Sequence, residues 1–170
     1  MSSSLPIIGV SSCLLGQAVR YDGNHKQNQT VLNLLQQNFS YRGFCPEMEI
    51  GLGVPREAIQ LVSTQLGIIC IGTKTEALDV TRPLRDIADQ QTWGQSLSGY
   101  IFKARSPSCG VGDVPIRHPT KKRLNGRGLF TIRFLELFPD LPITDEQQLD
   151  NSEFRQNFIA QVQTYHLLKQ

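Results

Sequence analysis

The stretch Leu5-Pro-Ile-Ile-Gly-Val-Ser-Ser-Cys-Leu-Leu-Gly16 sets the first expectation for the fold. Residues 5–12 form a compact apolar run that ends in two serines, a pattern typical of a buried strand. Cys13 follows at the predicted carboxyl end of that strand. Open α/β sheets build their binding sites at this end, because the loops converge there. The stretch therefore predicts a buried strand that delivers a cysteine to a site.

Strands and helices are expected to alternate along the rest of the chain. Apolar runs predict further strands over residues 39–44, 59–62, 66–71 and 100–104. One short helix is expected after Thr30, which would be its cap, and a second is expected to start at Thr81 and Pro83. Two further helices are expected over residues 128–137 and 152–168. This alternation predicts an α/β sandwich around a mainly parallel sheet, with helices on both faces. Residues 1–170 are expected to form one domain, because no repeat, linker or low-complexity tract interrupts them.

Two of these helices carry an apolar stripe that predicts which face packs inward. The helix that begins near Thr81 would pack through Leu84, Ile87, Ala88 and Leu97. The last helix would pack through Phe154, Phe158, Ile159, Val162 and Leu167.

Composition excludes several classes of protein. Of the 170 residues, 39% are hydrophobic and 19% are charged, which excludes a disordered chain, a coiled coil and a collagen-like repeat. A net charge of +2 is lower than a non-specific nucleic-acid binder usually carries. No segment has the pattern of a signal peptide or approaches the ~20 apolar residues of a membrane span. We therefore expect a cytoplasmic protein without a membrane partner.

Three of the four cysteines share one kind of position. Cys13, Cys45 and Cys109 each lie at or just after a predicted strand end, in turn-forming sequence. Separations of 32 and 64 residues exclude a local CxxC knuckle, but they allow three loops to meet over one sheet edge. Three thiolates at one point need a positive partner, such as a metal ion or an iron–sulfur cluster. Three separate buried cysteines are the alternative.

The fourth cysteine has different surroundings. Cys70 lies in the apolar run Gly67-Ile-Ile-Cys-Ile-Gly72, with no polar neighbour. Free cysteine packs in cores as a small hydrophobe, so we expect Cys70 to serve packing.

Six motifs in order resemble the thiouracil desulfidase family. They cover about residues 7–149 and are Ser11–Gly16, Val19–Gly23, Cys45–Glu47, Gly51–Arg56, Asp79–Thr81 and Lys103–Gly110. The resemblance implies a Rossmann-like fold and an oxygen-sensitive [4Fe-4S] cluster bound by three cysteines. By motif, these ligands are Cys13, Cys45 and Cys109. It also implies non-redox removal of sulfur from thiolated uracil compounds, with the substrate sulfur on the open iron of the cluster.

Such a reaction needs an acid/base group near the cluster. Glu47, two residues from Cys45, is the first candidate, although it could instead orient its loop or cap a helix. Ser106 and Ser108 flank Cys109 and could bond substrate, or they could cap the turn. Asp22 is a further candidate, but Tyr-Asp-Gly is also an ordinary turn.

Several cations could bind substrate. Lys103 and Arg105 precede Cys109 and could offset cluster or phosphate charge, or form a solvated rim. Arg20 and Arg56 could clamp a phosphate or form structural ion pairs. The basic stretch Lys121–Arg127 could bind a phosphate or an RNA backbone, or simply be solvated. We expect no ligand role for the three histidines, His25, His118 and His166.

The predicted function is therefore desulfuration of a small thiolated pyrimidine, such as 4-thiouridine monophosphate, 4-thiouridine or thiouracil, to the oxo base and sulfide. Some family members carry an extra C-terminal domain associated with thiolated tRNA, and its absence here favours a small substrate. Desulfuration of 4-thiouridine in tRNA is one alternative. A non-catalytic iron–sulfur or zinc module that senses redox state is another. The ring position of the sulfur and the oligomeric state stay open.

Overall fold

A computed structural model describes residues 4–122 and 124–170 of the chain. Its first sheet, sheet A, has the strand order β2-β1-β5-β8, and all three strand pairs are parallel. The strands are β1 (Ile7–Ser11), β2 (Ser40–Phe44), β5 (Gly99–Phe102) and β8 (Ile143–Asp145). The apolar runs predicted β1, β2 and β5 to within two residues at each end. The parallel sheet is confirmed.

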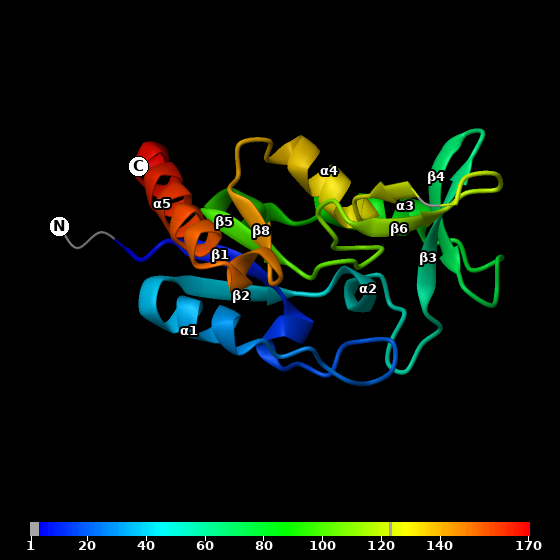
Figure 1. Cartoon of the computed structure of the whole chain (residues 1–170), viewed down its shortest axis with the longest axis horizontal. Coiled ribbons are helices and arrows are strands. Elements are labelled where there is room, and N and C mark those ends of the chain that lie inside the picture. The colour runs from blue at the N-terminus through cyan, green and yellow to red at the C-terminus, as the bar shows by residue number, and fades with distance from the viewer. Residues whose placement is uncertain (1–3, 123) are drawn as a thin grey trace.

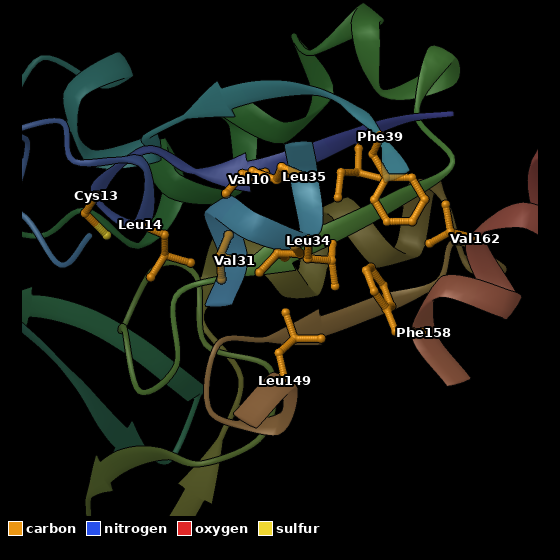
Figure 2. Packing of buried hydrophobic residues seen from close by; sticks show 12 residues of the cluster. Val10, Cys13, Leu14, Val31, Leu34, Leu35, Phe39, Leu149, Phe158 and Val162 are labelled. Carbon is orange, nitrogen blue, oxygen red and sulfur yellow. The ribbon is translucent and has the colours of Figure 1, made fainter. Parts of the chain in front are cut away.

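Helices cover both faces of sheet A, as expected. On one face, α1 (Gln29–Asn38) and α5 (Ser152–Lys169) pack against β1, and Figure 2 shows this layer. On the other face lie α3 (Thr81–Asp89) and α4 (Leu129–Leu137). Phe44, Phe130 and Phe134 form an aromatic core there, with neighbouring ring centroids 5.2–5.3 Å apart.

A second sheet, sheet B, was not predicted as a separate sheet, although the runs 59–62 and 66–71 predicted two of its four strands. Its order is β4-β3-β6-β7, and it mixes parallel and antiparallel pairs. The strands are β3 (Ile59–Thr64), β4 (Gly67–Gly72), β6 (Val114–Arg117) and β7 (Leu124–Gly126). In Figure 1 the β3–β4 hairpin lies at the end of the molecule opposite α5. Helices α3 and α4 join the sheets, because Leu84 and Leu129 pack on sheet B while Ile87 and Phe130 pack on sheet A.

The structure corrects three details of the helices. Asn28, and not Thr30, caps α1, because Asn28 Oδ1 accepts a 3.0 Å hydrogen bond from the Val31 backbone N–H. In α5 only Phe158 and Val162 of the predicted stripe are buried, and Ile159 packs at the edge. Phe154 and Leu167 are 59% and 65% exposed. Leu97 is buried but lies beyond α3, after the short helix η2 (Thr92–Ser96).

The remaining short helices place site residues or close the chain. They are η1 (Ser12–Leu15), α2 (Pro46–Glu49) and η3 (Gln148–Asp150). Within the described residues, no helix is both long and apolar enough to cross a bilayer.

Candidate cluster site at the edge of sheet A

One cavity of about 320 Å³ lies at the carboxyl edge of sheet A. Cys13, Cys45 and Cys109 all line it. Cys13 lies in η1 directly after β1, and Cys45 follows β2 as the N-terminal cap of α2. Cys109 lies in the loop after β5. Because β2, β1 and β5 are adjacent and parallel, their carboxyl ends bring these three loops together.

The loop that carries Cys109 is fastened to the start of α4. Backbone N–H groups of Leu129 and Thr131 donate to the Pro107 and Ser108 carbonyls at 3.0 and 3.3 Å. The Thr131 hydroxyl donates to the Cys109 carbonyl at 2.8 Å. Gly128 packs so tightly here that a Cβ would lie 2.3 Å from the Ser108 carbonyl carbon. The position of Cys109 is therefore set by an element that begins about 20 residues later.

Burial controls the chemistry of the three thiols. It raises the pKa of Cys13 to about 11, although the nearby Lys103 ammonium acts in the opposite direction. Burial also raises the pKa of the Cys45 and Cys109 thiols, and the Cys45 charge raises that of Cys109 further. Thiols of this kind become thiolates when a cation displaces their protons.

The three cysteines share one cavity lining. Thiolate sulfur is the usual ligand of iron–sulfur clusters and a common ligand of zinc. Within residues 4–122 and 124–170, no three His, Cys, Asp or Glu side chains lie close enough together to hold one metal ion.

Cys70 lies apart from this cavity. It is fully buried in β4, within the core of sheet B. Burial raises the pKa of its thiol to about 12, with smaller effects from the charges of Glu47 and Asp79. These surroundings agree with the expected packing role.

A hydrogen-bonded chain of side chains lies beside Cys109. The Ser108 hydroxyl donates to Glu47 Oε1 at 2.9 Å, and Ser108 Oγ is 3.6 Å from the Cys109 sulfur. Ser106 Oγ is 3.0 Å from Ser108 Oγ and accepts the Cys109 backbone N–H at 3.1 Å. Ser106 thus shapes the turn, while Ser108 connects Glu47 to the cysteine. Glu47, Ser106 and Ser108 all line the cavity together with Cys109.

Arg56 holds the other side of Glu47. Its Nε and Nη2 lie 2.9 and 2.8 Å from Glu47 Oε2. Its remaining donors bind the Gly53 and Val19 carbonyls, both at 2.8 Å. The side chains of Arg56 and Glu47 are only 6% and 13% exposed. Of the two alternatives for Arg56, the structure contains the ion pair, and the pair together with the two carbonyl contacts occupies all three guanidinium nitrogens.

Lys103 also has a carboxylate partner, which the sequence analysis missed. Its ammonium forms an ion pair with Glu146, directly after β8. Glu146 Oε2 also accepts the Ala104 backbone N–H at 2.7 Å, and the Lys103 backbone N–H donates to Ser11 Oγ at 2.9 Å. Glu146 therefore fixes the chain between β5 and Cys109. Nothing in its sequence surroundings signals this role, because the contact joins segments that follow two different strands, β5 and β8.

The other two predicted cations, Arg20 and Arg105, have fewer protein partners than Arg56 and Lys103. Arg20 lines the cavity, 3.6 Å from Asp22, and its buried Nε makes no hydrogen bond within the described residues. Arg105 lines the cavity, is exposed, and has no carboxylate partner in the described part of the chain. Its φ of 62° is left-handed, a strained conformation that is enriched at functional sites.

Asp22 and the histidines lie outside the cavity lining. Asp22 accepts the Asn24 backbone N–H at 3.0 Å, which holds the pKa of its carboxyl below the usual range. His25 and His118 accept backbone N–H groups in exposed turns. His166 Nδ1 is 3.0 Å from the Ser98 hydroxyl. The basic stretch Lys121–Arg127 leads into and includes β7, and its Arg123 lies outside the described residues.

Comparisons with known proteins agree with this geometry. A solved structure described as the [4Fe-4S]-dependent thiouracil desulfidase TudS is 29% identical and superposes with a TM-score of 0.66. The match covers 85% of this chain and 93% of TudS. The uncharacterised protein YbbK of Bacillus subtilis (strain 168) is 29% identical over 133 residues, 72% of this chain and 85% of YbbK. The 2-thiouracil desulfurase family profile matches residues 8–146. The chain therefore belongs to the 2-thiouracil desulfurase family.

Proposed function

We propose that this protein is a [4Fe-4S]-dependent desulfidase of a small thiolated uracil compound, with 4-thiouridine monophosphate as the preferred substrate. The observation that carries the proposal is the shared cavity. Three cysteines from three sheet crossovers line it together with the hydrogen-bonded pair Ser108–Glu47. The family and the likeness to TudS supply the class of reaction.

Cys13, Cys45 and Cys109 would hold the cluster. Their shared place around one cavity supports this assignment, because thiolates are the usual ligands of iron–sulfur clusters. With three protein ligands, a [4Fe-4S] cluster supplies one open iron that acts as a soft Lewis acid toward a thiocarbonyl sulfur. Lys103 is held by Glu146. Its charge partly opposes the rise that burial causes in the pKa of Cys13, so it would add positive charge beside the thiolates.

Glu47 and Ser108 would move the protons of the reaction. Replacing C=S by C=O consumes one water and releases hydrogen sulfide, so protons leave the attacking water and reach the departing sulfur. Glu47 would act as the base. Arg56 holds its Oε2, and its Oε1 accepts the hydrogen bond from Ser108. Ser108 can pass a proton between Glu47 and the cavity, since its hydroxyl both donates and accepts. Ser106 fixes the rotation of Ser108.

Arg20 and Arg105 would bind a phosphate of the substrate. Both line the cavity, and neither has its guanidinium donors saturated by the protein as Arg56 does. Guanidinium groups bind phosphate in a planar, two-bond geometry. A free base would leave these donors unused, so the pair favours a nucleoside monophosphate. The cavity, about 320 Å³, is at the small end of the range of about 300–1,000 Å³ for pockets that bind small molecules.

The first experiment measures iron and acid-labile sulfide per chain after anaerobic reconstitution, then sulfide release. We expect about four of each per chain, as a [4Fe-4S] cluster requires. The substrates to compare are 4-thiouridine monophosphate, 4-thiouridine, thiouracil and thiolated tRNA. Turnover of the monophosphate ahead of the others supports the proposal. Turnover confined to thiolated tRNA would show that tRNA, and not a small pyrimidine, is the substrate. A protein that binds the cluster but releases no sulfide from any substrate would favour a redox sensor.

A further inference from the structure

A second cavity adjoins the cavity that the three cysteines line. It has a volume of about 420 Å³, and it shares Tyr21, Arg56 and Ala58 with the first cavity. Its other lining residues are Glu57, Thr73, Lys74 and Thr75. A ligand that occupies the first cavity can therefore extend past Tyr21 into the second.

Backbone groups hold the Glu57 carboxylate at this second cavity. Glu57 Oε1 accepts the backbone N–H of Lys74 and, at 2.6 Å, that of Thr75. Gly72 makes this approach possible, because a Cβ there would lie 2.7 Å from Glu57 Oε1 and 2.6 Å from the Thr75 carbonyl oxygen. The hydrogen bonds from Thr75 and Lys74 hold the pKa of Glu57 below its usual range, so the group is charged at neutral pH. Its Oε2 accepts no hydrogen bond from the described part of the chain.

A fixed carboxylate with one oxygen available distinguishes a hydroxyl from a phosphate. A carboxylate only accepts hydrogen bonds, so a hydroxyl satisfies it, whereas a phosphate is repelled by its charge. Dinucleotide-binding folds use a carboxylate in this way to bind a ribose hydroxyl. Arg56 and Lys74 also line the cavity, but Arg56 is paired with Glu47 and Lys74 is exposed to solvent. The second cavity therefore favours hydroxyl groups.

The order of groups across the two cavities matches the order of groups in a nucleotide. Arg20, proposed above to bind phosphate, lines the first cavity, and its guanidinium carbon lies 5.4 Å from the centroid of the Tyr21 ring. The Tyr21 carbonyl accepts the Arg56 backbone N–H at 2.9 Å, which ties Tyr21 to the residue before Glu57. A nucleoside 5′-monophosphate carries its base and its phosphate on one ribose, whose 2′ and 3′ hydroxyls form the remaining edge. With base and phosphate in the first cavity, that edge would face Glu57.

We propose that Glu57 is a specificity-determining residue, whose free carboxylate oxygen accepts hydrogen bonds from the 2′,3′-diol of the substrate ribose. The inference rests on the proposed function and adds a reason for its small substrate. Within an RNA chain the 3′ oxygen carries a phosphate, which removes one donor and brings negative charge to Glu57. Glu57 would thus select a free nucleotide over the same nucleotide within tRNA.

The test compares Glu57→Gln with wild type and with a matched control, Glu76→Gln. Glutamine retains an oxygen for the Lys74 and Thr75 backbone N–H groups but has no charge. Glu76 is an exposed residue close to the same loop and lines neither cavity. KM is measured on the reconstituted proteins for 4-thiouridine monophosphate, its 2′,3′-dideoxy analogue, 4-thiouridine 3′,5′-bisphosphate and thiouracil. Calorimetry adds Kd for uridine monophosphate and its dideoxy analogue, which reports binding without turnover.

The expected changes depend on the ribose alone. In wild type, KM should be about tenfold higher for the dideoxy analogue and for the bisphosphate than for the monophosphate. Glu57→Gln should raise KM for the monophosphate about fivefold, because a neutral hydrogen bond replaces a charged one. It should lower KM for the bisphosphate and leave KM for the dideoxy analogue and thiouracil unchanged. Glu76→Gln should match wild type with all four substrates.

Three outcomes would overturn the inference. A ratio of KM between monophosphate and dideoxy analogue that is the same in wild type and Glu57→Gln would show that the diol does not contact Glu57. A wild type that prefers the bisphosphate would show that Lys74 draws a phosphate into the second cavity. An equal rise in KM for thiouracil and for the monophosphate in Glu57→Gln would show that Glu57 only supports the fold of the site.

Failure of the proposed function gives a different result. A wild type that binds the cluster but releases no sulfide from any of the four substrates contradicts the proposed function. Calorimetry then still tests Glu57, because the wild type should bind uridine monophosphate about tenfold more tightly than the dideoxy analogue. Equal Kd values for the two nucleotides would overturn the role of Glu57 in that case as well.

Discussion

Ser108 donates a 2.9 Å hydrogen bond to Glu47 Oε1 from a position 61 residues later in the chain. The two residues come from different crossovers, one after β2 and one after β5. Each residue also lies near a cysteine. Glu47 is two residues after Cys45, and Ser108 Oγ is 3.6 Å from the Cys109 sulfur. The pair thus connects the proposed base to the proposed cluster site.

Removal of either member should reduce turnover without removing the cluster. We expect Glu47→Gln and Ser108→Ala each to lower kcat by about 10²–10⁴, the range for a positioned acid/base group. Iron content should stay at the wild-type level. The control is Glu49→Gln, which makes the same change on an exposed residue of α2. Wild-type kcat in Glu47→Gln would remove Glu47 from the mechanism.

Arg56 should matter for stability as well as for turnover. Arg56→Ala leaves the Glu47 carboxylate buried without its partner, so we expect a loss of about 3–5 kcal/mol in the free energy of unfolding. Arg56→Lys keeps the charge but cannot reach both Glu47 and the two carbonyls, and should lower kcat. Chemical denaturation and sulfide release measure the two effects. Arg82→Ala, in an exposed pair with Asp86, should change stability by less than about 1 kcal/mol.

The ligand assignment predicts a difference between the four cysteines. Substituting Cys13, Cys45 or Cys109 by Ala should remove the [4Fe-4S] absorption band and leave substoichiometric iron. Cys70→Ala should retain the full cluster, because Cys70 packs in sheet B away from the cavity. Cluster loss in a folded Cys70→Ala protein would show that the ligand set is wrong.

Arg105 should separate phosphate binding from catalysis. Arg105→Gly removes a guanidinium and relieves a left-handed φ of 62°. We expect KM for 4-thiouridine monophosphate to rise about tenfold, with KM for thiouracil unchanged. The folded protein should gain about 1 kcal/mol, because glycine adopts this conformation without strain. Arg117→Ala, remote in β6, provides the control. An equal rise in KM for both substrates would contradict a phosphate role.

The buried Cys70 thiol predicts a loss of stability in alkali. Burial raises its pKa from 9.0 to about 12, so the unfolded chain releases this proton before the folded one does. The stabilising contribution is complete below pH 9 and disappears as pH rises toward 12. At pH 10 the loss should be about 1 kcal/mol. Denaturation of metal-free wild type and Cys70→Ala at pH 8 and pH 10 measures it. A parallel decline in both would contradict the assignment.

The sequence predicted the parts of the site that depend on strand ends. Cys13 and Cys45 follow β1 and β2 within two residues, so the rule for parallel sheets was enough to bring them together. In sheet B the apolar runs predicted β3 and β4 but not the other two strands. Strand β6 contains Pro115, which argues against a strand, and β7 has only three residues. Here tertiary pairing overrides weak local preference.

The supporting residues could not have been predicted from local pattern. Glu146 binds Lys103 across 43 positions, and Arg56 reaches back 37 positions to the Val19 carbonyl. Such contacts depend on how the crossovers pass one another.

The origin of the cysteines in separate crossovers fixes an order of events during synthesis. When Cys45 leaves the ribosome, 64 more residues must emerge before Cys109 has emerged as well. The Cys109 loop then gains its support only when the start of α4, from Gly128 onward, has also emerged. A cluster that needs all three thiolates can therefore be inserted only into a nearly complete, folded chain. Insertion of the proposed cluster would therefore come late, after the segments that hold all three cysteines have emerged.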